Sequence, residues 1–335
     1  MRKIQFILLV LIFVSGCEEQ HGLFPKSIEY DFQFPVELHP NSISIDEERN
    51  LIYVASQNNS KSNHISKIQR FSLDGRVQKE LDFLSFNEGE YSHYYPIDLC
   101  IDVEGILYVL VQPFSKQDYE EYYTLIEKLS ILQFDMNFGF QNEFEVPDNP
   151  NNKNRYTSIA YANNYLFVTG GLIINKISKD GELVSEISPS NFEENADSLS
   201  HVIVADMEVS SGGMIYLTGQ GAALFDDYSG CYLSKLEPKS GSLTTTYSQS
   251  RTGVIAAWPN NPGLAIDKEG NLYLATYYGR SLEIYNSNLE FLKQVDITKY
   301  NWDEDTYPID IALYDSWIYI PDHRNNLVQV YEASY

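Results

Sequence analysis

The stretch PIDLCIDVEGILYVL, residues 96–110, has a close counterpart in PIDIALYDSWIYI, residues 308–320. Both begin with Pro-Ile-Asp, pass through a short polar segment and end in an apolar-Tyr-apolar triplet. Alternating apolar residues followed by a β-branched and aromatic run are typical of strands, and the polar residues between them are typical of a turn. Each stretch therefore predicts two antiparallel strands joined by a tight turn.

The same pattern occurs six times along the chain. The copies begin at Asn41, Pro96, Thr157, Ala205, Pro262 and Pro308, and their triplets are centred on Tyr53, Tyr108, Phe167, Tyr216, Tyr273 and Tyr319. The spacing between triplets, 46 to 59 residues, leaves room for four short strands in each copy. Asp74-Gly75, Asp180-Gly181 and Ser240-Gly241 predict hairpin turns between third and fourth strands. Four antiparallel strands repeated radially predict an all-β fold, a six-bladed β-propeller of four-stranded blades.

The fifth copy, PGLAIDKEGNLYLATYYGRSLEIYNSNLEFLKQV from Pro262, resembles an NHL-type repeat. PDHRNNLVQVYE from Pro321 resembles the third-strand part of the same repeat. The resemblance is most specific in copies two, five and six, and covers the rest of the chain after the N-terminal segment by periodicity. Six-bladed propellers of this kind include ligand-binding lipoproteins, lactonases, lyases and scaffolds, so the resemblance implies the fold and leaves the activity open.

The chain also offers a strand that closes the ring. The sixth copy stops at Tyr335 after its third strand, which would leave an open sheet edge. KSIEYDFQFP, from Lys26, alternates as a single strand before the first copy begins. We expect this strand to be the fourth of blade six, so that the propeller spans residues 26–335.

The N-terminus predicts export and a membrane anchor. Arg2 and Lys3 precede an apolar run over residues 6–14 that is too short to span a bilayer as a helix. Val-Ser-Gly-Cys at residues 14–17 resembles the lipobox of bacterial lipoproteins. The resemblance implies a signal peptide over residues 1–16, lipid chains such as palmitate on Cys17, and a tether over residues 17–25. We expect a cell-envelope protein, on the periplasmic or surface side of an outer membrane rather than on an inner membrane. An ordinary signal peptide with an incidental cysteine is the alternative.

Charge and cysteine content narrow the range of partners. The chain has 23 Lys and Arg against 47 Asp and Glu, a net charge of −24. Nucleic acid is an unfavourable partner for such a chain, because phosphate backbones need positive charge. Strong acidity fits an extracytoplasmic protein or a cation binder. Cys100 and Cys231 fall two blades apart, so we expect both to be unpaired.

Three aspartates recur at one position of the repeat. Asp98, Asp206 and Asp310 start the inner strands of blades two, four and six, and blades one, three and five have Ser42, Ser158 and Gly263 at or beside that position. If they point into the channel, three carboxylates alternate with three small residues, and Ca²⁺ would relieve their repulsion. The alternatives are that each aspartate caps its own loop, or that a wide channel keeps all three solvated.

Aromatic residues and arginines gather in the loops at the same end of the predicted ring. The predicted binding residues are Tyr94, Tyr95, Tyr156, Trp258, Trp302 and Tyr307, together with Arg280 and Arg324. Flat rings beside charged groups suit a glycan or a partner protein. The alternative is that tyrosine, with 26 copies, packs between blades as a favoured strand residue.

Motifs for catalysis are sparse. The sequence has no G-x-S-x-G, no H-E-x-x-H and no glycine-rich phosphate loop after a strand. His39, His93 and His201 precede inner strands, and none of the six histidines lies within metal-ligand spacing of another. The sequence therefore favours a binding or scaffold module and leaves an enzymatic role uncertain. The alternative is a metal-dependent, lactonase-like hydrolase or lyase with a cation in the channel.

Overall fold

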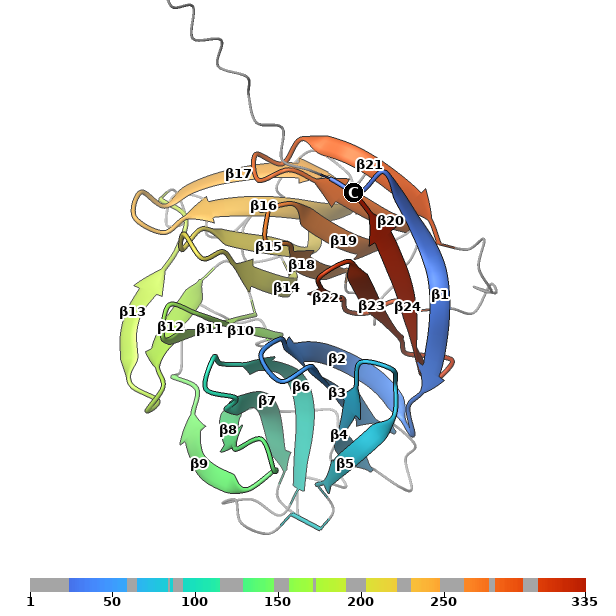
Figure 1. The fold of residues 1–335 in the computed structure, drawn as a ribbon. Coiled ribbons are helices and arrows are strands. Elements are labelled where there is room, and N and C mark those ends of the chain that lie inside the picture. Colours follow the sequence, from blue (N-terminus) through green and yellow to red (C-terminus); the bar gives the residue numbers. More distant parts are fainter. Residues whose placement is uncertain are drawn as a thin grey trace, which may run out of the picture.

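The computed structural model describes residues 24–58, 65–83, 85–86, 93–114, 129–147, 157–170, 173–190, 203–221, 230–247, 262–276, 281–297 and 307–335. In these ranges the regular structure is β-strand alone, in six four-stranded antiparallel sheets arranged around a central channel (Figure 1). The predicted six-bladed propeller is thereby confirmed. These ranges contain no helix that is long and apolar enough to cross a membrane.

Each blade contributes one strand to each of four concentric positions. The inner strands, which line the channel, are β2 (His39–Asp46), β6 (His93–Ile101), β10 (Ser158–Ala162), β14 (Ile203–Val209), β18 (Gly263–Ile266) and β22 (Ala312–Tyr314). The second strands are β3 (Leu51–Gln57), β7 (Leu107–Phe114), β11 (Tyr165–Thr169), β15 (Ile215–Gly221), β19 (Leu272–Thr276) and β23 (Trp317–Asp322). The third strands are β4 (Ser66–Ser72), β8 (Ser130–Phe134), β12 (Ile174–Ser178), β16 (Gly230–Glu237), β20 (Ser281–Tyr285) and β24 (Leu327–Ser334). The outer strands are β5 (Val77–Asp82), β9 (Phe140–Glu145), β13 (Leu183–Ile187), β17 (Ser242–Tyr247), β21 (Phe291–Asp296) and β1 (Ser27–Pro35).

The apolar core lies between blades rather than inside any one of them. One cluster, for example, packs Tyr53 and Ile68 of blade one against Leu107 and Leu132 of blade two. Another packs Tyr273 of blade five against residues of blade six. The aromatic at the centre of each triplet is buried because it fills such an interface. The repeating triplet therefore specifies contacts between neighbouring blades.

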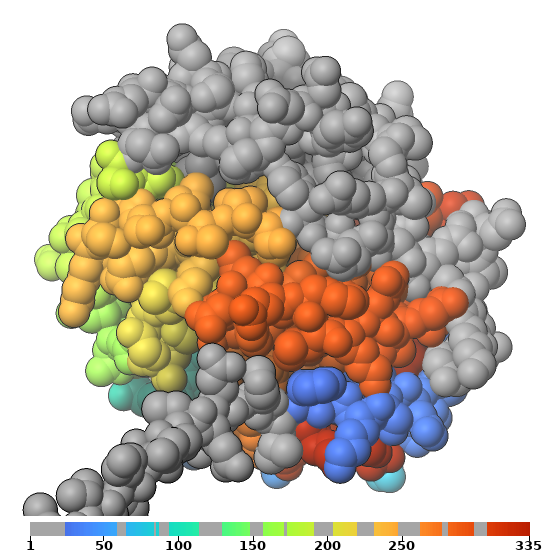
Figure 2. Space-filling view, turned by 90° about the horizontal axis from the view of Figure 1, so that it is seen from above, coloured from blue at the N-terminus to red at the C-terminus, as the bar shows by residue number. Residues whose placement is uncertain are grey.

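The predicted closing strand is confirmed. β1 pairs with β24 along its whole length, from Ser27 opposite Ser334 to Pro35 opposite Leu327. Figure 1 shows β1 beside β24 in blade six, with the C-terminus at the end where β1 begins, and Figure 2 shows β1, in blue, on the surface beside the orange strands of blade five. β1 also holds the next blade, because Phe34 packs against Phe71 of β4 with ring centroids 4.9 Å apart.

Irregular pairing marks the start of several inner strands. The register between β6 and β7 shifts between Pro96 and Asp98, and blades one and four have shifts at the equivalent place. In blade six, β22 starts only at Ala312, and Pro308 forms an isolated bridge with Asp322. The sequence predicted uninterrupted alternation from Pro308, but proline has no N–H for the ladder and a bulge changes where the next side chain points.

The loop assignment of residues 93–95 was wrong. These residues belong to β6, which starts at His93 rather than at Pro96. Tyr94 consequently alternates with its neighbours and is 3% exposed, in the core beside Phe83 and Phe86. Its hydroxyl donates to Glu143 Oε2 at 2.8 Å, and Tyr95 is half-buried in the same strand.

The predicted hairpins and cysteine states are confirmed. Asp74-Gly75, Asp180-Gly181 and Ser240-Gly241 lie in turns between third and outer strands. Gly75 has φ +79°, and an added Cβ would lie 2.5 Å from Phe34 Cβ, so glycine permits both the turn and the contact with β1. Cys100 and Cys231 are both free.

Candidate functional site

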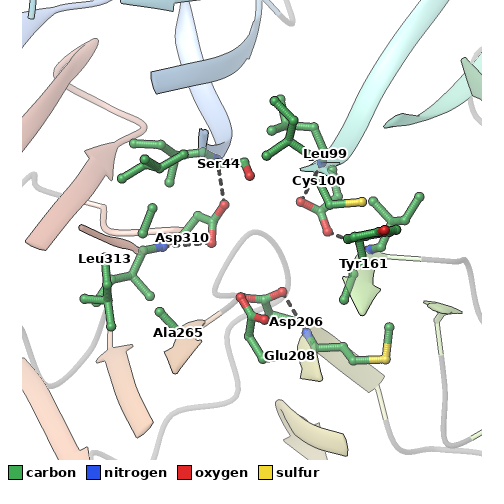
Figure 3. A pocket seen from close by; sticks show the side chains of 18 of the residues that line it. Ser44, Leu99, Cys100, Tyr161, Asp206, Glu208, Ala265, Asp310 and Leu313 are labelled. Carbon is green, nitrogen blue, oxygen red and sulfur yellow. Dashed lines mark hydrogen bonds between the residues drawn. The ribbon is translucent and has the colours of Figure 1, made fainter. Parts of the chain in front are cut away.

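Two layers of side chains line the central channel. At the end where the inner strands begin, the first layer contains Asp98, Asp206 and Asp310, and the other three blades have the buried residues Ser42, Ser158 and Gly263 at the equivalent position. The second layer lies two residues further along each strand and contains Ser44, Cys100, Ala160, Glu208, Ala265 and Ala312, each paired with the triplet aromatic of its blade. A cavity of about 280 Å³ is lined by the three aspartates and by the whole second layer (Figure 3).

The carboxylate of Asp98 connects three blades. Ser42 Oγ of blade one donates to Asp98 Oδ1 at 2.6 Å, and the backbone N–H of Leu99 donates to the same oxygen at 2.8 Å. The N–H of Ile159, in blade three, donates to Oδ2 at 2.8 Å. The donors come from blades one, two and three, so the Asp98 side chain ties these blades together.

Asp206 repeats this arrangement two blades further on. Ser158 Oγ of blade three and the N–H of Met207 donate to Oδ1 at 3.0 and 2.7 Å. The N–H of Leu264, in blade five, donates to Oδ2 at 2.7 Å. Blades three, four and five are therefore linked in the same way as blades one, two and three.

Asp310 provides the third link between blades and accepts hydrogen bonds from two donors, one fewer than Asp98 or Asp206. Its Oδ1 accepts the N–H of Ile311 at 2.7 Å, and its Oδ2 accepts the N–H of Ile43, in blade one, at 2.7 Å. Blade five has Gly263 where blades one and three have serine, so no hydroxyl reaches Asp310 from that side. The blades approach closely there instead, because a Cβ on Gly263 would lie 2.4 Å from Asp310 Cα.

Burial opposes ionisation of these groups. Desolvation raises the pKa of Asp98, and it raises the pKa of Asp206 to about 7 with help from the charge of Asp98. Desolvation also raises the pKa of Asp310 well above its ordinary value, with help from Asp206 and Asp98. The hydrogen bonds act in the opposite direction and are outweighed. The channel therefore holds protons at a pH where exposed carboxyls have lost them.

We expect the folded protein to lose stability as the pH rises from 5 to 8.5. Asp206 has a pKa of about 7 in the folded state, against about 4 for an aspartate in an unfolded chain. Its contribution to stability is therefore complete below about pH 4, decreases as the pH rises between these two pKa values, and is lost above about pH 7. Asp206→Asn should reduce the difference between melting temperatures at pH 5 and pH 8.5, measured at constant ionic strength. The variant should melt lower at both values, because one amide cannot accept every bond that Asp206 accepts, so the difference is the informative quantity. An unchanged difference would show that Asp206 does not hold this proton.

The three aspartates were predicted as candidate metal ligands, and in this structure their carboxylates serve contacts between blades. Both oxygens of each carboxylate already accept at least one N–H bond. Within the described ranges, no three His, Cys, Asp or Glu side chains are placed to hold a metal ion. Ca²⁺ takes roughly 6–8 oxygen ligands, so a bound ion would need water or backbone oxygens in addition to these carboxylates. Calcium binding in the channel stays a prediction.

Only part of the predicted loop surface falls within the described residues. Outside them lie Cys17, Tyr156, Trp258, Arg280 and Trp302. Tyr307 and Arg324 are brought together: the guanidinium carbon lies 5.5 Å from the Tyr307 ring centroid, and Nη1 donates to the Tyr307 hydroxyl at 3.3 Å. Tyr307 is half-buried and Arg324 is exposed.

A buried carboxylate fixes the backbone of this pair. Asp322 is 0% exposed, and its Oδ1 accepts the N–H groups of Tyr307, Arg324 and Asn325 at 3.1 to 3.2 Å. Its Oδ2 accepts from the Asn325 amide at 2.8 Å. The turn between β23 and β24 is thus preorganised at the end of the channel where the inner strands begin.

Two arrangements were not predicted. His39 and His323 pack with ring centroids 5.1 Å apart and their planes tilted by 30°, across the junction of blades one and six, and each Nδ1 bonds a backbone carbonyl of the other segment. Burial and the neighbouring His39 lower the pKa of His323. Glu208 in the second channel layer was also missed, although its place two residues after Asp206 in an alternating strand was a usable signal.

Comparisons with known proteins support the fold. No protein-family model and no curated protein matches the sequence. An unknown-function protein from Dyadobacter fermentans has a TM-score of 0.61 at 10% identity, over 92% of this chain and 100% of that one. Virginiamycin B lyase from Staphylococcus aureus has a TM-score of 0.53 at 11% identity, over 91% and 99%. Chaetomium thermophilum Raptor has a TM-score of 0.54 at 11% identity, and this chain, of which 92% is matched, spans 29% of it. At such identities the likeness shows the propeller fold alone.

Proposed function

We propose that this protein is a lipid-anchored module of the bacterial cell envelope, attached through Cys17, and that its propeller binds a glycan or a partner protein. The binding surface is the end of the ring where the inner strands begin. The observation that carries this proposal is the Tyr307–Arg324 pair, which the buried Asp322 holds in place at that end. An aromatic face beside a guanidinium offers stacking and directional hydrogen bonds to the same ligand.

Within the ring, we assign a structural role to the channel aspartates and the binding role to the loops. Asp98, Asp206 and Asp310 accept bonds from neighbouring blades, so their chemistry is used to hold the blades together. Loops set on such a rigid frame vary without disturbing it, which is why binding residues collect there in many folds. The N-terminal signal and the acidic composition suit a protein that works outside the cytoplasm.

A second candidate is a metal-dependent hydrolase or lyase that uses the channel. The acidic cavity favours it, since a cation would relieve the repulsion among the buried carboxyls. Two of the similar folds are lyases, virginiamycin B lyase and a streptogramin B lyase, but at 11% and 12% identity they support the fold and no particular reaction. A saturable rise in melting temperature on titration with Ca²⁺ would support this candidate, and the absence of a shift would contradict it.

One experiment tests both halves of the main proposal. Cys17→Ala should release the protein from the membrane fraction, and the released chain then serves as the reference in glycan-array and envelope-extract pull-down assays. Adding Arg324→Ala or Tyr307→Ala should weaken the captured interaction by roughly tenfold, since residues of this type often dominate binding.

Arg76→Ala is the matched control, because Arg76 is an exposed arginine in a turn at the opposite end of the ring. An equal loss of binding in Arg76→Ala, or full binding by both Arg324→Ala and Tyr307→Ala, would contradict the proposed surface. Persistence of the Cys17→Ala chain in membranes would contradict the lipid anchor.

A further inference from the structure

Two histidines meet at the junction of blades six and one. His39 begins β2 of blade one, and His323 lies in the turn between β23 and β24 of blade six. Their ring centroids are 5.1 Å apart, and both side chains are half-buried. The two residues are 284 positions apart in the sequence, so only the closed ring brings them together.

The hydrogen bonds of this pair determine which nitrogen of each ring carries the proton. Nδ1 of His39 bonds the carbonyl oxygen of His323 at 2.8 Å, and Nδ1 of His323 bonds the carbonyl oxygen of Pro40 at 2.8 Å. Because a carbonyl oxygen can only accept, each Nδ1 is the donor, and Nε2 of each neutral ring keeps its lone pair. Burial lowers the pKa of His323 and so favours its neutral form. The pair therefore offers two Nε2 atoms of the kind that metal ions bind.

Such bonding is the usual setting of a histidine that binds a metal. A ligating histidine nearly always donates its other ring N–H to a carboxylate or a backbone carbonyl, which fixes the ring and makes the ligating nitrogen more basic. The backbone around both rings is also fixed. The N–H of His323 donates to the carbonyl oxygen of Tyr307 at 2.9 Å, and His39 pairs with Gln57 in the ladder between β2 and β3. Both rings are thus oriented by rigid elements.

The separation of the rings matches that of two ligands on one ion. Zn²⁺ is tetrahedral and binds imidazole nitrogen at about 2.0–2.1 Å, so two imidazoles on one ion have ring centroids about 5 Å apart. The observed 5.1 Å agrees with this value. Within the described part of the chain, the buried Oε1 of Gln57 has no hydrogen-bond partner. Gln57 lies directly opposite His39 and shares its face of the sheet, so it offers an oxygen atom as a further ligand.

We propose that His39 and His323 bind one Zn²⁺ ion through their Nε2 atoms, across the junction of blades six and one. The two imidazoles fill part of the coordination sphere, and oxygen atoms from Gln57 or water fill the rest. The bound ion would join β2 to the turn between β23 and β24 and so fasten blade one to blade six. Ca²⁺ and Mg²⁺ prefer oxygen ligands and should not compete for the two imidazoles. This inference depends neither on the proposed binding surface nor on a cation in the channel.

The test is a titration of the purified Cys17→Ala chain with Zn²⁺, followed by calorimetry and by melting temperature. This background lacks the Cys17 thiol, which could itself bind zinc. We expect one saturable site per chain and a rise in melting temperature on binding, since the unfolded chain does not hold the two rings together. Ca²⁺ or Mg²⁺ at matched ionic strength should leave the affinity for Zn²⁺ unchanged.

His39→Asn and His323→Asn separate metal binding from the contact between blades. The amide nitrogen of asparagine takes the place of Nδ1 and can still donate to the carbonyl, whereas asparagine has no atom in the place of Nε2. Each variant should therefore melt close to the parent chain without zinc. Each should bind Zn²⁺ roughly tenfold or more weakly, since even the loss of a hydrogen bond to a ligand costs roughly 10–100-fold.

Glu186→Gln is the control for zinc held by the acidic surface, because Glu186 is an exposed acid on the outer strand β13. Full Zn²⁺ binding in this control and loss in both histidine variants would support the site. Absence of Zn²⁺ binding by the parent chain, or unchanged affinity in either histidine variant, would overturn the proposal. An equal loss in Glu186→Gln would also overturn it, since the zinc would then be bound by surface carboxylates.

Discussion

A chain that begins at residue 37 should lose the cooperative unfolding transition that a chain beginning at residue 24 retains. The missing segment contains β1, which pairs with β24 from end to end. Without it, blade six keeps three strands, and β24 presents an unpaired edge with Val328, Val330 and Tyr331 uncovered on its faces. Open apolar edges of this kind favour aggregation.

The expected loss is large because β1 serves two interfaces. Ile28 packs in the core between blades five and six, and Phe34 packs in the core between blades six and one. Val36, just after the strand, joins the second of these cores. Burying three such side chains contributes about 5–9 kcal/mol at roughly 1.5–3 kcal/mol each. That is comparable to the total stability of a typical domain, about 5–15 kcal/mol.

The measurement is a melt followed by circular dichroism and by tryptophan fluorescence on both chains. Coincident cooperative transitions in the shorter chain, at the temperature of the longer one, would refute the role of β1 in closure. A synthetic peptide of residues 24–36 provides a further check, since an added strand should pair with β24 and restore the transition. A scrambled peptide of the same composition should not.

The ring could be predicted because its determinants repeat. The triplets around Tyr53 and Tyr319 and the lone strand after Lys26 each carry a local pattern, and repetition makes a weak pattern specific. The alternation of Asp98, Asp206 and Asp310 with small residues also followed from register alone. Alternation with period two allowed these aspartates to point into the channel, but the sequence also allowed each of them to cap its own loop.

The bonding of the channel could not be predicted in the same way. Asp98 accepts the N–H of Ile159, which lies 61 residues further along the chain, and no local pattern contains that contact. The bulge before Asp98 turns the side chain toward the neighbouring blade, and bulges leave little trace in composition. Tyr94 shows the same limit, because its burial depends on β6 starting at His93.

Gly263→Ala should destabilise the ring by about 3 kcal/mol, the upper part of the usual range for overpacking in a well-packed core. The equivalent residues in blades one and three are Ser42 and Ser158, so a side chain at this position is tolerated elsewhere in the ring. In blade five an added Cβ would lie 2.4 Å from Cα and 2.5 Å from the carbonyl carbon of Asp310. These are backbone atoms of the segment directly before β22, and they cannot rotate aside as the end of a side chain can.

The relief of this clash would require blades five and six to separate. Asp310 would then move away from Ile43, whose N–H it accepts at 2.7 Å, and the link to blade one would weaken as well. The substitution should therefore lower the melting temperature by several degrees and reduce the protection of the Ile43 amide in hydrogen exchange. Gly263→Ser should behave similarly, because its hydroxyl could donate to Asp310 only after the same displacement.

Gly212→Ala is the matched control, since the nearest atom to an added Cβ there is Ser210 Oγ at 3.8 Å. Its effect should stay within about 0.5 kcal/mol, as for most surface substitutions. The φ angle of Gly263 lies outside the left-handed region, so an alanine could adopt its backbone conformation without strain. A large loss in Gly263→Ala alone would thus be caused by the contact between blades five and six. Equal stability of the two variants would mean that these blades already stand far enough apart to hold a methyl group, and that the ring is closed by its outer strands rather than at the channel.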